Sequence, residues 1–223
     1  MQFRSLFNKV FGKEKEYKDV TALKLLNGYT NAYTPFSGNA YDDATVRDCI
    51  DTIARHFGKM RPKHVIKDNG KIIKTVDDRL NYLLGSYPNE LMTASEFLEK
   101  VIAQYYTYNN AFIYIKWDMA LEKIEALYPL DFPLLEILED RENNLYARFT
   151  FGGGERTVVP YSSIIHIRRH FNRDEIFGDD NSRIMIEDLS TLKAAKASIV
   201  NAVKSFTALP NASVKPLNLF MGI

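Results

Sequence analysis

The chain has 223 residues, 46% of them hydrophobic and 26% charged, which suits one large globular domain or two small ones. Its 29 lysines and arginines nearly balance 28 aspartates and glutamates, and this argues against a polybasic protein that binds nucleic acid mainly by phosphate attraction. The 14 phenylalanines and 13 tyrosines exclude an intrinsically disordered chain, and the single cysteine excludes a disulfide scaffold or a cysteine-rich zinc module.

The N-terminal segment, residues 1–20, is interpreted as an amphipathic arm. Apolar residues recur at helical spacing over Phe3–Phe11, with lysine and arginine between them. We favour a helix that packs on the chain's own body or on a neighbouring subunit, with adsorption to a membrane surface as the alternative. The segment lacks the continuous apolar centre of a signal peptide, and no run in the chain reaches the about 18 apolar residues of a membrane-spanning helix, so we expect neither secretion nor membrane insertion.

The first long helix is predicted to begin near Thr45, with Asp48 in capping-box order, and to be ended by Pro62. Cys49 falls within its apolar stripe, which predicts a buried structural thiol. The stripe comprises Val46, Cys49, Ile50, Ile53, Ala54, Phe57 and Met60. Asn69-Gly70 then separates two β-prone runs and predicts a hairpin over residues 64–74.

Two further helices are predicted before the pattern becomes strand-like. Asp78 caps a short helix that Gly85 closes, and Thr93 with Glu96 caps a helix that stops at Asn109-Asn110. Strands are expected over residues 111–117, 124–128, 134–138, 145–151, 157–159 and 164–168, and a long helix over 184–206. This order of helices, a mostly antiparallel sheet and a final helix predicts an α+β fold with helices flanking the sheet.

The expected domain organisation is an arm over 1–20, an α+β body over 21–210 and an apolar tail over 211–223. The tail ends in Leu219-Phe220-Met221-Gly222-Ile223, which is less polar than most domain ends. We expect the chain to stop before its fold is complete, or this end to be buried between subunits.

Three patterns invite a chemical interpretation. His166 and His170 are four residues apart, but on a strand that spacing separates them by about 13 Å, too far to chelate one ion. Gly152-Gly153-Gly154 precedes a strand, so it predicts a hairpin turn and no phosphate loop. The acidic cluster of Asp174, Glu175, Asp179 and Asp180 lacks calcium-loop spacing, and nearby arginines favour surface ion pairing. A binding or structural role becomes the leading class, with no catalytic residue, cofactor or metal expected.

Four short strings in order then resemble the portal proteins of tailed bacteriophages. The first is the helix Val46–Met60 with the hairpin at Asp68-Asn69-Gly70, and the second is Pro88–Phe97, similar to Asn-Pro-x-x-Thr-x-x-Glu-Phe and running on to Asn109-Asn110-Ala111-Phe112. The third and fourth are Leu127-Tyr128-Pro129-Leu130-Asp131 and Ile164-Ile165-His166-Ile167-Arg168, with Gly178 downstream.

The chain departs from the family's pattern at three places. Glu90 stands in place of proline, Asn109 in place of a glycine that a left-handed turn favours, and residues 178–184 in place of Gly-x-Ser-Pro-Ile. The resemblance implies a structural signature, and His166 is expected to be hydrogen-bonded within the body. The signature residues are Thr93, Glu96, Phe97, Asn110, Ala111, Pro129, Leu130, Asp131, His166, Ile167, Arg168 and Gly178.

The resemblance also implies a function. It implies a structural subunit of a homo-oligomeric ring, in the family usually a dodecamer, at one capsid vertex of the virion, assembled in the host cytoplasm. Expected partners are further copies of the chain, the terminase large subunit, the capsid or scaffold and head–tail connector proteins, and double-stranded DNA that passes through the channel. Near-neutral charge suits DNA that slides without many phosphate contacts.

Two alternatives stay open. One is a metal-dependent nuclease or phosphodiesterase that uses His166, His170 and the acids of 174–180. The other is an adaptor that binds a membrane or a partner through the Phe3–Phe11 arm.

Overall fold

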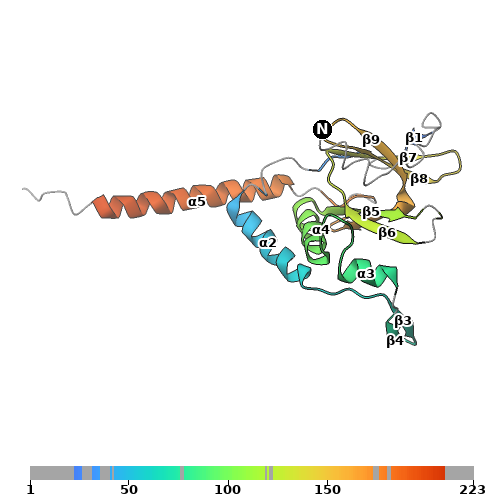
Figure 1. The fold of residues 1–223 in the computed structure, drawn as a ribbon. Coiled ribbons are helices and arrows are strands. Elements are labelled where there is room, and N and C mark those ends of the chain that lie inside the picture. Colours follow the sequence, from blue (N-terminus) through green and yellow to red (C-terminus); the bar gives the residue numbers. More distant parts are fainter. Residues whose placement is uncertain are drawn as a thin grey trace, which may run out of the picture. The chain divides into compact units, whose positions relative to one another are not determined.

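The computed structural model describes residues 23–26, 32–35, 41, 43–75, 78–118, 120, 123–172, 176–179 and 182–208 (Figure 1). The predicted arm over 1–20 and the tail over 211–223 lie outside these residues. The chain divides into two compact units, Met1–Ser182 and Arg183–Ile223, and each is described by itself. This division falls within the stretch 21–210 that the sequence groups as one body. In the described part of the chain, each helix is too short or too polar to cross a bilayer.

Two predictions about helix α2 (Ala44–Gly58), its capping box and the burial of Cys49, are wrong. Its N-cap is Asp43, whose carboxylate accepts a hydrogen bond from the Thr45 N–H at 3.0 Å, so the start lies before the predicted Thr45–Asp48 box. The buried residues are Ile50, Ala54 and Gly58, four apart along one face. Cys49 lies about 100° away from that line and is exposed, so the predicted burial of its thiol is wrong.

The predicted hairpin is confirmed as β3 (Val65–Asp68) and β4 (Lys71–Thr75). Asn69 and Gly70 have φ values of 48° and 79°, the left-handed pair that a two-residue type I′ turn needs. The register shifts between Ile66 and Lys67, which places a bulge in the ribbon. The two strands pair only with each other in the described chain and form a small sheet of their own.

Two capped helices follow, as predicted. Asp78 caps α3 (Arg79–Gly85) by accepting from the Asn81 N–H, and Thr93 caps α4 (Ala94–Tyr108). Helix α2 approaches α4 closely at Gly58, where an added Cβ would lie 2.6 Å from the Glu99 Oε1 atom. Glycine at this position therefore lets the two helices come together.

The predicted strands form two antiparallel sheets besides the hairpin, where the sequence analysis expected one. The three-stranded sheet has the order β10 (Ile164–Arg168), β5 (Asn110–Trp117), β6 (Ile124–Pro129). The five-stranded sheet has the order β1 (Lys24–Leu25), β7 (Leu134–Glu139), β8 (Leu145–Thr150), β9 (Arg156–Pro160), and β2 (Ala32–Tyr33) also pairs with β7. The Gly152-Gly153-Gly154 stretch is the hairpin turn between β8 and β9, as predicted. The fold is α+β, as expected.

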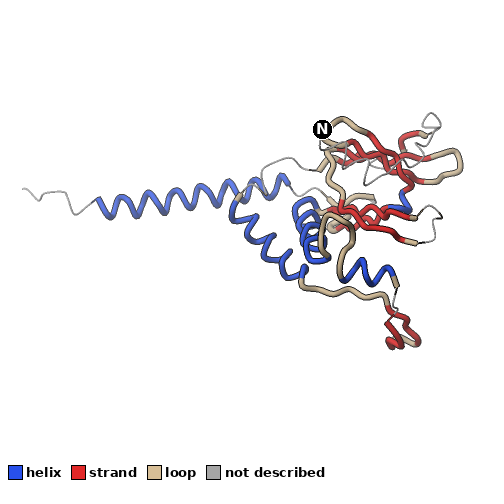
Figure 2. Tube along the Cα trace, in the orientation of Figure 1, coloured by secondary structure: helices blue, strands red, loops and turns tan. Residues whose placement is uncertain are grey.

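The three-stranded sheet is the middle layer of the larger unit (Figures 1 and 2). Phe112 and Tyr114 of β5 join Leu135, Ala147 and Phe149 of the five-stranded sheet in one buried cluster. The alternating residues Ala111, Ile113 and Ile115 face the other way and pack with Phe97 and Val101 of α4. Strand β5 is therefore buried on both faces, which explains its continuous apolar run.

Helix α5 (Ser182–Ala208) belongs to the second unit and has 27 residues, close to the predicted 184–206. Several side chains of its predicted apolar stripe are exposed, among them Ile199 at 64%, Val203 at 56% and Phe206 at 74%. A helix gains most of its stability by burying such a stripe. Helix α5 thus presents apolar surface along its length.

Candidate functional site at the α4–β5 junction

The site begins with the way in which α4 is started and ended. The Thr93 hydroxyl accepts from the Glu96 N–H at 3.4 Å, and the Glu96 carboxylate accepts from the Thr93 N–H at 2.7 Å, which confirms the predicted capping box. The hydrogen bond from the Thr93 backbone lowers the pKa of Glu96 below its ordinary value. One residue later, Phe97 is buried against the three-stranded sheet.

Asn109 ends α4 in the left-handed conformation, with φ of 57° and ψ of 9°. This confirms the expectation that asparagine fills a left-handed position here. Its side-chain amide donates to the Asp179 carbonyl at 2.7 Å, and its own carbonyl accepts from the Arg169 N–H at 3.0 Å. The end of α4 is thereby hydrogen-bonded to Arg169 and to Asp179.

Asn110, only 2% exposed, is the centre of the junction. Its Nδ2 donates to the carbonyls of Tyr108 at 3.1 Å and Gly178 at 3.2 Å. Its Oδ1 accepts from the Gly178 N–H at 2.7 Å and from His166 Nε2 at 2.9 Å. A side-chain amide has two donor hydrogens and two acceptor positions, and these four hydrogen bonds use all of them. The opposite amide orientation would set Nδ2 against the Gly178 N–H, donor against donor.

His166 connects the junction to the strand β10. Because Asn110 Oδ1 can only accept, Nε2 of His166 carries the proton, and Nδ1 lies 2.8 Å from the Tyr161 hydroxyl, from which it accepts when the ring is neutral. Burial raises the pKa of Tyr161, which keeps this hydroxyl protonated as a donor. The imidazole also stacks on Phe112, its cross-strand partner, at 4.1 Å between ring centroids. His166 is thus hydrogen-bonded within the body, as expected.

Gly178 fits where no other residue would. A Cβ at this position would lie 2.3 Å from the carbonyl oxygen of Asn109 and 2.5 Å from that of Arg169. Both are main-chain atoms, and the Asn109 carbonyl already accepts from the Arg169 N–H, so they cannot move aside at small cost. Gly178 is therefore required by the close approach of three main-chain segments.

Arg168 and Ile167 of β10 lie away from the buried core, whereas Ile164 is part of it. The Arg168 guanidinium donates to the Ile176 carbonyl at 2.6 Å and lies over the Phe171 ring at 4.7 Å. Ile167 is 38% exposed on the opposite side of the strand. His170 is exposed, with φ of 52°, and its carbonyl accepts from the Asp179 N–H.

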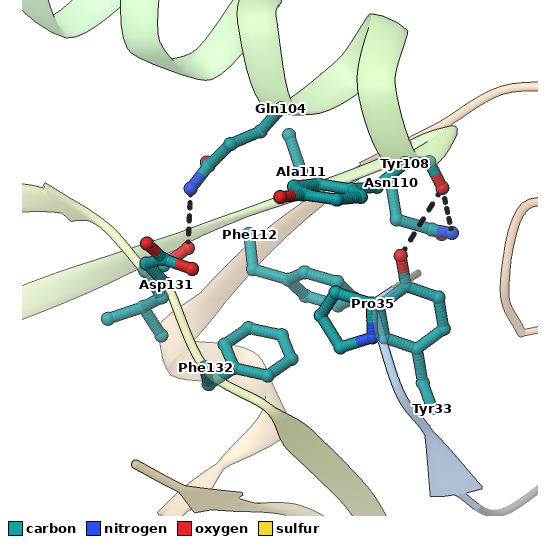
Figure 3. Close-up of a pocket in the computed structure, with 10 residues that line it drawn as sticks. Tyr33, Pro35, Gln104, Tyr108, Asn110, Ala111, Phe112, Asp131 and Phe132 are labelled. Carbon is teal, nitrogen blue, oxygen red and sulfur yellow. Dashed lines mark hydrogen bonds between the residues drawn. The ribbon is translucent and has the colours of Figure 1, made fainter. Parts of the chain in front are cut away.

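A small cavity adjoins the junction, as Figure 3 shows. The Leu130 N–H donates to the Phe112 carbonyl, and Gln104 donates to the Leu130 carbonyl, both at 2.8 Å, so the Pro129–Asp131 turn is pinned between α4 and β5. Tyr33 closes the other side by donating to the Tyr108 carbonyl at 3.2 Å. The space open to the centre of a water-sized sphere is about 10 Å³, enough for one water molecule and far below a metabolite pocket.

The structure brings together part of the predicted set. Asn110, Ala111, His166 and Gly178 meet at the junction, whereas Thr93 and Glu96 lie at the other end of α4, about 22 Å away for its 15 residues. Tyr161 and Tyr108 complete the junction and were not predicted, whereas Asn109 was expected only as a left-handed position. Tyr161 gives no sequence signal, because a short 3₁₀ turn, Tyr161–Ser163, is what returns it to His166.

The structure describes only some of the residues that the nuclease alternative would use. Asp174, Glu175 and Asp180 lie outside the described residues, and both ring nitrogens of His166 take part in hydrogen bonds. Within the described ranges, no group of three histidine, cysteine or acidic side chains is placed to hold a metal ion. What the junction does is fix the relative position of four main-chain segments.

Comparison with known proteins assigns the family. No curated protein matches the chain. Among similar solved structures are a chain in the neck of an empty gene transfer agent particle computed with C6 symmetry (16% identity, TM-score 0.49, 85% of this chain and 50% of that chain) and one in the virion of the native particle (18%, 0.49, 82% and 44%). A third lies in the neck of the native particle computed with C12 symmetry (16%, 0.49, 80% and 44%). The chain spans about half the length of these chains or less.

The family model named phage portal protein matches residues 44–208, from the first residue of α2 to the last residue of α5. The matched region contains the whole α4–β5 junction and well over half of the chain. The chain therefore belongs to the phage portal protein family.

Proposed function

We propose that this protein is a structural subunit of a homo-oligomeric portal ring at one vertex of a phage capsid. Double-stranded DNA passes through the ring, the packaging terminase docks on it during assembly in the host cytoplasm, and the neck and tail attach to it. The observation that carries this proposal is the family match over residues 44–208.

The junction supports a role that depends on shape. A ring closes only if each subunit presents its two contact surfaces at a fixed angle, because small errors accumulate around the ring. The Asn110–His166–Gly178 bonds fix α4, β5, β10 and residues 176–179 relative to one another. We propose that the twelve signature residues of the sequence analysis serve this rigidity, with no reacting group among them.

Helix α5 supports association of copies. Ile199, Val203 and Phe206 follow one another at intervals of four and three residues, so they form one stripe, and each is more than half exposed. Contiguous exposed apolar surface marks an interaction site. We propose that neighbouring copies cover this stripe in the assembled ring, and that segments on either side of residues 21–210 add further contacts.

The overall charge is compatible with DNA passage. A net charge of +1 gives the chain little general attraction for phosphates, and DNA that slides through a channel must not be gripped by many such contacts.

Negative-stain electron microscopy of the purified protein tests the proposal. We expect closed rings of uniform diameter with a central hole. Persistent monomers over a wide range of salt and protein concentration would contradict it.

A further inference from the structure

One end of the larger unit is strongly basic. Residues 59–75, the linker after α2 and the β3–β4 hairpin, carry six lysines and arginines against one aspartate, a net charge of +5. Three isoleucines of the same hairpin are exposed: Ile66 at 50%, Ile72 at 63% and Ile73 at 65%. A two-stranded ribbon is marginally stable by itself, so a surface of this kind gains from being covered.

The base of this hairpin is held in place. The His64 ring bonds to the Asp78 carboxylate at 2.6 Å. The His64 main chain exchanges two hydrogen bonds with the Asn81 side chain, at 2.7 and 3.1 Å. Because Asp78 also caps α3, the hairpin projects from a fixed point on the fold. A projecting element with a fixed base can serve as a docking surface.

The other end of the same unit is acidic. Residues 130–160, which contain β7, β8 and β9, carry six acidic residues against three arginines, a net charge of −3. At the β7–β8 turn lie Glu139, Asp140 and Glu142, together with Arg141, and in the pairing register Glu139 stands between Leu145, which is 38% exposed, and Lys24. Figure 1 shows the hairpin and this sheet at opposite ends of the unit.

We propose, on the basis of the proposed ring, that the β3–β4 hairpin of one copy docks on the β7–β8 turn of the next copy. On the ribbon face that meets the turn, lysine side chains approach the turn glutamates and the exposed isoleucine of that face covers Leu145. The two surfaces differ, so the contact is head-to-tail, and repetition of such a contact closes into a ring when the rotation allows. Opposite charges at the two ends also oppose the head-to-head arrangement.

Charge exchange between the two surfaces tests this contact. The hairpin variant is Lys71→Glu with Lys74→Glu, and the turn variant is Glu139→Lys with Glu142→Lys. Asp140 is left intact because its carboxylate accepts from the Glu142 and Asn144 N–H groups and shapes the turn. The control is Lys100→Glu with Lys123→Glu, an equal charge change at exposed positions elsewhere on the unit.

Association is followed by analytical ultracentrifugation at low ionic strength. We expect each variant alone to associate at least about tenfold more weakly, because like charges then meet at every contact. An equimolar mixture of the two variants regains association, because each hairpin then meets a turn of opposite charge. The control associates as the unaltered protein does. Association that survives both reversals, or that the mixture fails to restore, overturns the contact.

The results distinguish a failure of the hairpin contact from a failure of the proposed ring. Rings formed by the unaltered protein and by both variants would leave the proposed function standing and refute the hairpin contact alone. An unaltered protein that never associates would refute both. Far-UV circular dichroism checks the fold of each variant. Position 139 pairs with Lys24, so a lysine there places two like charges opposite each other. If the turn variant unfolds for this reason, Glu142→Lys alone replaces it.

Discussion

Asn110 shows how a buried polar residue can specify a structure. Its amide uses both donors and both acceptor positions, and its partners come from α4, β10 and the 176–179 segment. A saturated buried amide of this kind opposes alternative arrangements, because each would leave a polar group without a partner.

Asn110→Ala is expected to lower the free energy of unfolding by about 2–4 kcal/mol, because the Gly178 N–H and two carbonyls lose their partner in the interior. Urea denaturation followed by circular dichroism measures the loss. Asn172→Ala is the control, because Asn172 is exposed, and it should stay within about 0.5 kcal/mol. Equal stability of the two variants would show that the junction does not hold the fold.

Gly178→Ala tests the close approach of main-chain segments. The added Cβ would overlap two carbonyl oxygens, so we expect a loss of about 2 kcal/mol or more and a lower Tm. Gly153→Ala is the matched control, since a Cβ there meets no atom within 4 Å. Calorimetry that gave the same Tm for both variants would refute the packing argument.

At the scale of elements, most local signals were sufficient, although α2 is capped by Asp43 and not by the predicted Thr45–Asp48 box. The Asn69-Gly70 turn, the Asp78 cap and the Thr93–Glu96 box lie within a few residues of the structure that they specify, and the structure confirms each. The burial of Cys49 was wrong because only the partner helix α4 decides which residues of α2 are covered.

The junction and the split into two sheets could be predicted only in part. Asn110 and Gly178 are 68 residues apart and meet through pairing that no local pattern records. The strand lengths gave no sign of which strands would share a sheet. The signature residues were named, but their partner Tyr161 was not, because it reaches His166 through a short 3₁₀ turn that has no sequence signal.

Strands β7 and β8 carry a cross-strand ion pair that predicts a pH dependence. Glu136 and Arg148 are directly opposite, and the guanidinium Nε donates to the carboxylate at 2.8 Å, which lowers the pKa of Glu136. A lowered folded-state pKa gives stability that is present above the unfolded pKa of about 4.3 and is lost as the pH falls through the folded value.

Glu136→Gln should therefore reduce stability at pH 7 and flatten its decline at acidic pH. Thermal denaturation between about pH 7 and pH 3 measures both effects, because the protonation of Glu136 contributes to that decline. The control is Glu142→Gln, since Glu142 is exposed and bonds to the Asp140 carboxylate through its backbone N–H. A decline as steep as in the unaltered protein would contradict the linkage.

At the scale of the whole molecule, helix α5 of the second unit presents an exposed apolar stripe among the described residues. Ile199→Glu with Val203→Glu places charges in the α5 stripe without changing the larger unit, so we expect association to weaken at least about tenfold while the thermal transition of the larger unit is retained. Ser198→Glu with Ser205→Glu adds the same charges beside the stripe as a control. Sedimentation velocity compares the two, and equal association would exclude the stripe from the interface.

We propose that copies of this chain close into a ring by repeating the same head-to-tail contacts. Native mass spectrometry of the purified protein tests it most directly, because it counts the copies in each assembly. We expect one dominant mass, a whole multiple of 25.7 kDa, that persists on tenfold dilution. A spectrum that contains the single chain alone, or a continuous ladder of masses as from an open filament, would contradict it.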